Sequence, residues 1–253
     1  MLFRRIKAHI EKENWFAVFL DFLIVVVGIL LAFQITNWNE DWVDSKRESQ
    51  ILAAIQKDLL TDQKVLNTGI EMANLNINVG NYLLSKAGLA SIQKIVVPVE
   101  VGVILSQTEF EVTVPGALPE QVTSNLWKHV AFRYHPTQSN AAFSSLVTAG
   151  DLTIISDVDL ASELQGYNQA WQSLSGSQDL TFRVFRDRLV FVGQEYGLSP
   201  FHSGKEDELI ELLRINRKLA GALRTMTEYA ILHREALENL YQRNLLLSKR
   251  LND

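Results

Sequence analysis

The chain has 253 residues, with 24 basic and 29 acidic side chains, a formal net charge of −5 and no cysteine. The acidic balance gives no support for nucleic-acid binding, which needs a basic face. The lack of cysteine excludes disulfide bonds and thiolate chemistry. Hydrophobic residues make up 47% of the chain, which is enough for a sizeable core.

An apolar run from residue 16 to residue 35 is the first element. About 20 helical residues span about 30 Å, one hydrocarbon thickness, so we predict a transmembrane helix over residues 15–38. Trp15, Trp38 and Trp42 flank the run and are expected to lie at the two interfaces. The run is longer than the apolar core of a cleaved signal peptide and no small-x-small cleavage site follows it, which favours an anchor over a signal peptide.

The charges on the two sides of this run predict its orientation. Basic residues precede it and acidic residues follow it, namely Arg4, Arg5, Lys7 and Lys12 before, and Glu40, Asp41 and Asp44 after. The positive-inside rule therefore puts residues 1–14 in the cytoplasm and residues 39–253 in the periplasm, with the helix in the bacterial inner membrane.

Five residues of the run are candidates for association between membrane helices. Asp21 is a costly carboxylate inside the apolar stretch, which favours a subunit contact, although a side chain that reaches the inner interface explains it equally well. Gly28 and Ala32 form a small-xxx-small pair that allows close helix approach. Gln34 and Asn37 would add a hydrogen-bonding collar at the outer end, which helix capping and headgroup contact explain nearly as well.

The remaining chain predicts an elongated helical bundle. Residues 44–86 have a helical pattern and are expected to continue the anchor as a stalk. From Lys205 to Lys249 a heptad pattern predicts one helix of about 45 residues, about 68 Å long. Asn216, His233 and Asn244 fall on its apolar seam, where polar residues fix register or oligomeric state. A metal site at His233 is disfavoured because no second ligand stands at ligand spacing.

Three further helices are expected between these segments. The first extends from Thr137 to Ala149 and ends at Gly150, a suitable C-cap. The second begins after a cap at Ser156 or Asp157 and ends at residues 175–177, after which a separate helix covers residues 178–196.

Residues 88–136 are the least regular part of the sequence. Partial alternation would allow a hairpin, but we favour short helices and loops that start at Pro98 and Pro119. His129 and His135 flank residues 132–134, where a surface loop with ordinary packing is favoured over the wall of a pocket.

Two segments resemble a large family of uncharacterised single-pass bacterial membrane proteins, a domain family of unknown function. The first segment is VVVGILLAFQITNWNE, residues 25–40, preceded by Asp21 where the family commonly has glutamate. The second is residues 132–169, similar to the family's pair of helices joined by a glycine turn. The resemblance implies a membrane anchor and an outer helical domain, and it implies no activity.

We therefore predict an all-α protein with one membrane helix, a periplasmic bundle and a long C-terminal helix. The sequence lacks HExxH, GxSxG and GxxxxGK[ST] motifs, so we expect a non-enzymatic assembly component without cofactor or metal. Its expected partners are membrane lipid and further copies of itself. The alternative is a ligand-sensing or partner-binding ectodomain that passes a signal to another membrane protein.

Overall fold

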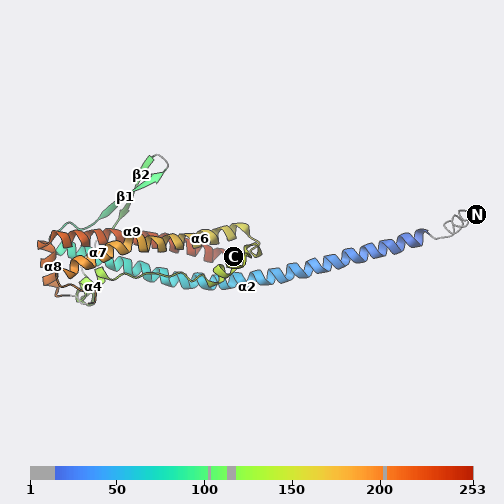
Figure 1. Ribbon diagram of the computed structural model, residues 1–253, viewed down its shortest axis with the longest axis horizontal. Helices are drawn as coiled ribbons and strands as arrows, with labels where there is room; N and C mark the ends of the chain where they lie inside the picture. Colours follow the sequence, from blue (N-terminus) through green and yellow to red (C-terminus); the bar gives the residue numbers. More distant parts are fainter. Residues whose placement is uncertain (1–14, 102–103, 113–117, 202–203, 253) are drawn as a thin grey trace, which may run out of the picture. The chain divides into compact units, whose positions relative to one another are not determined.

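The computed structural model describes residues 15–101, 104–112, 118–201 and 204–252. The described chain is mostly helical and divides into two compact units, one ending at Leu52 and the other beginning at Ala53. Helix α2 extends over Trp15–Lys86, which confirms the predicted continuation of the helix beyond the apolar run (Figure 1).

The first unit contains the apolar part of α2. By length and composition this helix is able to cross a membrane, although a signal sequence would share these properties, and none of its most apolar 18-residue window is buried. Its large side chains are therefore uncovered, as Phe22, Leu30 and Ile35 illustrate with exposed fractions of 66%, 61% and 66%.

The second unit is built on long helices that lie side by side (Figure 1). They are the C-terminal part of α2, helix α6 (Val158–Ser177) with its continuation α7 (Arg183–Gln194), and α9 (Arg217–Arg250). Each contributes fully buried side chains to the core, among them Leu66, Leu83, Trp171, Leu189, Leu223 and Leu237. The bundle thus buries its apolar faces within one chain.

The predicted break at residues 175–177 is wrong. A π-helical turn, Gln178–Phe182, joins α6 directly to α7. Gly176 and the serines on either side of it destabilise a helix by about 1 kcal/mol or less per residue. The buried side chains of Leu174 and Phe182 pack on the core and offset this destabilisation. The cap at Asp157 is confirmed, since its carboxylate accepts a hydrogen bond from the Leu160 backbone N at 3.0 Å.

The predicted single C-terminal helix is two helices. Helix α8 covers Glu206–Ile215, and Asn216 then takes an extended conformation and caps α9 by accepting from the Leu219 backbone N at 3.5 Å. Asparagine side chains compete with the backbone for hydrogen bonds, which favours a cap over a helix interior. Asn216 is half-buried and lies at the junction of α8 and α9 instead of in the interior of one helix.

Residues 94–101 and 104–111 pair as the two strands of a hairpin, the alternative that we disfavoured. Strands β1 (Lys94–Val101) and β2 (Ile104–Glu111) pair antiparallel with Lys94 opposite Glu111, so the chain is not entirely α-helical. The Asn81 side chain fixes the residues that precede β1. Its Oδ1 accepts from the Ile92 backbone N at 2.7 Å, and its Nδ2 donates to the Ile92 backbone O at 3.1 Å. The short helices α3 (Glu120–Thr123) and α4 (Leu126–Ala131) do follow Pro119, as predicted.

After α4 the chain returns in an extended segment, residues 132–140, to helix α5 (Ala141–Ala149). Gly150 ends α5 with a left-handed φ of 75°, which confirms the predicted C-cap. The 3-10 turn Leu152–Ile154 then leads into α6.

Candidate functional site

The polar residues of the C-terminal helix find partners inside their own chain. Asn244, which is fully buried, donates to the Leu59 backbone O at 3.0 Å and to the Tyr167 hydroxyl at 2.7 Å. Tyr167 in turn donates to Asp62 Oδ2 at 2.9 Å. Asn244 therefore fixes α9 against α2 and α6, as expected of a polar residue that sets register.

Asp62 is the ionisable group at the centre of this first cluster and is 0% exposed. Burial raises its pKa to about 6, because desolvation disfavours the carboxylate, and the nearby Asp58 adds to the rise. Hydrogen bonds from the Ser139 backbone N, at 2.6 Å, and from Tyr167 oppose the rise. A carboxyl group with a pKa near 6 changes charge close to neutral pH.

Asp58 and Asp62 also explain why α5 begins later than Thr137. Asp58 accepts from the Ser139 hydroxyl at 2.9 Å and from the Ala142 backbone N at 3.1 Å. Further along α2, Asn76 donates to the Phe132 backbone O at 3.0 Å and to the His129 backbone O. These side chains hold residues 132–140 extended along α2.

A second buried cluster lies at the π turn. Gln178 is 3% exposed, and its amide joins two side chains: Nε2 donates to His233 Nδ1 at 2.9 Å, while Oε1 accepts from Arg133. Burial lowers the pKa of His233 far below its usual range, and Arg133 and His135 lower it further, so the imidazole is neutral. His233 is 3% exposed, and its hydrogen-bond partner Gln178 belongs to the same chain.

Arg133 lies beside a cavity of about 330 Å³. Its guanidinium stands 4.4 Å from the centre of the Phe182 ring. Burial lowers the pKa of Arg133 to about 9, with repulsion from Arg186 as the second cause, so the group keeps its charge at neutral pH. Phe132 and His135 also line this cavity, which corrects our preference for an ordinary surface loop.

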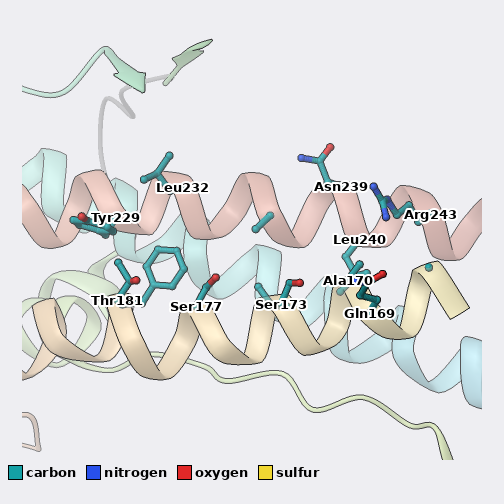
Figure 2. A pocket seen from close by; sticks show the side chains of 14 residues that line it. Gln169, Ala170, Ser173, Ser177, Thr181, Tyr229, Leu232, Asn239, Leu240 and Arg243 are labelled. Carbon is teal, nitrogen blue, oxygen red and sulfur yellow. The ribbon is translucent and has the colours of Figure 1, made fainter. Parts of the chain in front are cut away.

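A larger groove of about 760 Å³ runs between α6 and α9. Figure 2 shows Ser173, Ser177 and Thr181 on the side of their helix that faces α9, with Thr181 opposite Tyr229. Small residues such as Gly166 and Ala170 line the groove and leave its space open. The lining side chains offer hydroxyl and amide groups and one cation, Arg243.

The candidate association residues lie on α2 within the first unit. Gly28 is exposed, and a Cβ added there would meet nothing within 4 Å. Ala32, Gln34 and Asn37 are also exposed. The backbone of Asp21 is helical, and its side chain is outside the described part of the structure.

Of the three tryptophans expected at the membrane interfaces, the structure describes the side chains of Trp38 and Trp42. Trp38 and Trp42 are 78% and 63% exposed, and Lys46 Nζ lies 5.3 Å from the centre of the Trp42 ring. The side chain of Trp15 and all of residues 1–14 are outside the described residues.

Sequence reasoning missed Asp62, Tyr167, Arg133 and Gln178. Among the described residues there is no group of three or more His, Cys, Asp or Glu side chains placed to hold a metal ion. Comparison of the chain with protein-family models, curated proteins and solved structures found no match. The family resemblance of residues 25–40 and 132–169 stays a prediction.

Proposed function

We propose that this protein is a non-enzymatic assembly component, anchored in a membrane by residues 15–38, whose copies associate through the apolar part of α2. One observation carries the proposal: the most apolar window of α2 has no buried residue. Exposed apolar surface costs about 25 cal/mol per Å² in water, so this helix needs a cover of lipid or protein. With the charge bias around it, the helical domain would lie in the periplasm.

The anchor supports self-association better than α9 does. His233 and Asn244, the polar seam residues of α9, are both occupied by partners in their own chain. Gly28 has open space where a side chain would stand, and Ala32 follows one turn later on the same face. In a membrane such small residues let helix backbones approach closely.

The test of association is the molar mass of the full chain in a non-ionic detergent, measured by light scattering. Gly28→Leu is expected to convert a discrete oligomer to monomer. Val26→Phe adds similar bulk about 200° around the helix axis and serves as the matched control, expected to keep the oligomer. A wild-type chain that stays monomeric at every concentration would contradict self-association.

The anchor itself is tested separately. Cysteine labelling with a membrane-impermeant reagent, at an introduced Lys249→Cys on the exposed face of α9, is expected to reach the C-terminal helix from the periplasmic side only. N-terminal sequencing of the membrane-bound protein is expected to find residues 1–14 still attached. A product that begins beyond Trp38 would identify a signal peptide and overturn the anchor.

A further inference from the structure

Arg133 is a half-buried cation whose contacts among the described residues include no carboxylate. Its guanidinium donates to the Gln178 amide oxygen and stands over the Phe182 ring. A guanidinium has five N–H donors in a planar fork that matches a carboxylate. Gln178 occupies one side of that fork, and the cavity adjoins the side chain.

Two further arginines of α7 line the same cavity. Arg186 pairs with Asp187 at 2.8 Å, and Arg183 lies 3.8 Å from the same residue and 3.9 Å from Asp179. Asp179 is the single carboxylate among the lining residues, so arginines outnumber carboxylates there even when Asp187 is counted. The resulting positive potential favours an anion.

Apart from the polar side chains of His135 and Gln178, the other walls of the cavity are apolar. Phe132, Pro200 and Phe201 line it, and Phe132 and Phe201 are 48% and 85% exposed. A volume of about 330 Å³ lies at the lower end of the range for small-molecule sites. A bare inorganic anion would leave this apolar surface uncovered.

We propose that the cavity at Arg133 binds a small organic carboxylate, with the acid on the Arg133 guanidinium and an apolar group against Phe132 and Phe201. The arginines of α7 attract the anion, and Arg133 fixes its orientation. This site is independent of how copies of the chain associate, because all its residues belong to the helical domain.

The experiment measures benzoate binding to the full chain in detergent by calorimetry and by the shift in melting temperature. Benzamide is the neutral probe of the same shape, and inorganic phosphate is the anion without an apolar group. Benzoate is expected to bind and to raise the melting temperature, while benzamide and phosphate do not. Equal binding of benzoate and benzamide, or binding of phosphate alone, would overturn the proposal.

Variants then locate the site. Arg133→Gln is expected to weaken benzoate binding at least tenfold, because the charge-assisted hydrogen bonds are lost. Gln178→Glu keeps the size of the side chain but gives Arg133 an internal carboxylate, so it too is expected to abolish binding while the chain stays folded. Arg243→Gln removes an arginine of the α6 and α9 groove and is expected to bind as the wild type does. Unchanged binding in Gln178→Glu, or an equal loss in Arg243→Gln, would refute the assignment.

Discussion

Asp62 predicts an unusual dependence of stability on pH. Two effects compete at this carboxyl group: burial favours the neutral form, while hydrogen bonds from Ser139 and Tyr167 favour the charged form. With burial the larger effect, the pKa of Asp62 is raised to about 6 from 3.8. The folded protein therefore holds this proton more tightly than the unfolded chain does.

The size of the effect follows from linkage. A rise of about two pKa units corresponds to about 3 kcal/mol between the two protonation states. Because the folded pKa is above the unfolded one, the stability contributed by the proton is fully present below about pH 3.8 and is lost as the pH rises through about 6. Between pH 7 and pH 5 this group alone should raise the free energy of unfolding by about 1 kcal/mol.

The assay is urea unfolding of the full chain in detergent, followed by far-ultraviolet circular dichroism at several pH values. Asp62→Asn, which cannot titrate, is the reference, and its difference from the wild type largely cancels the other carboxyl groups. The wild type is expected to gain about 1 kcal/mol over the variant between pH 7 and pH 5. A difference that stays constant, or that shrinks on acidification, would show that the hydrogen bonds dominate and that Asp62 is charged.

Other positions test the packing and capping of the bundle. A Cβ at Gly193 would overlap the Trp127 indole, so Gly193→Ala is expected to lower stability by about 1–3 kcal/mol in the same urea assay. Gly166→Ala is its control: a Cβ there meets nothing within 4 Å, and stability should rise by about 0.5–1 kcal/mol, so a loss at both glycines would contradict the steric argument. Asn216→Ala removes the cap on the Leu219 backbone N, and a cost of about 1 kcal/mol is expected; a melting temperature equal to that of the wild type would refute the cap.

The elements with a strong local pattern could be predicted from the sequence. The apolar run and its helical continuation, the cap at Asp157 and the turn at Gly150 depend on residues close together in the chain. The hairpin was misjudged because Pro98 suggested a helix start, whereas in the structure it pairs with Gln107. The residues that precede β1 are fixed by hydrogen bonds between Asn81 and Ile92. These two residues are 11 positions apart, so the contact leaves no local sequence pattern.

The candidate site was harder to predict because its residues are far apart in the sequence. Arg133, Gln178 and His233 come from three segments, and only His233 stood out, as a polar residue in an apolar heptad. Asp62 had the pattern of an exposed helix residue because its neighbours Lys57, Asp58 and Lys64 are charged. In the structure it is buried against residues 132–140 and α6, where the Ser139 backbone N and the Tyr167 hydroxyl donate to its carboxylate.

The π turn determines where the arginines of α7 point. Each residue added to a helix rotates everything after it by about 100°. The buried positions Leu174, Gln178 and Phe182 follow one another in two steps of four, one residue more than the alternation of four and three found earlier in α6. The wide turn absorbs that extra residue. Deleting Leu180, a residue of this turn that does not line the cavity, would rotate Arg183 and Arg186 by about 100° away from Arg133, so a single-codon deletion would erase the basic cavity while every residue that lines it stays in the chain.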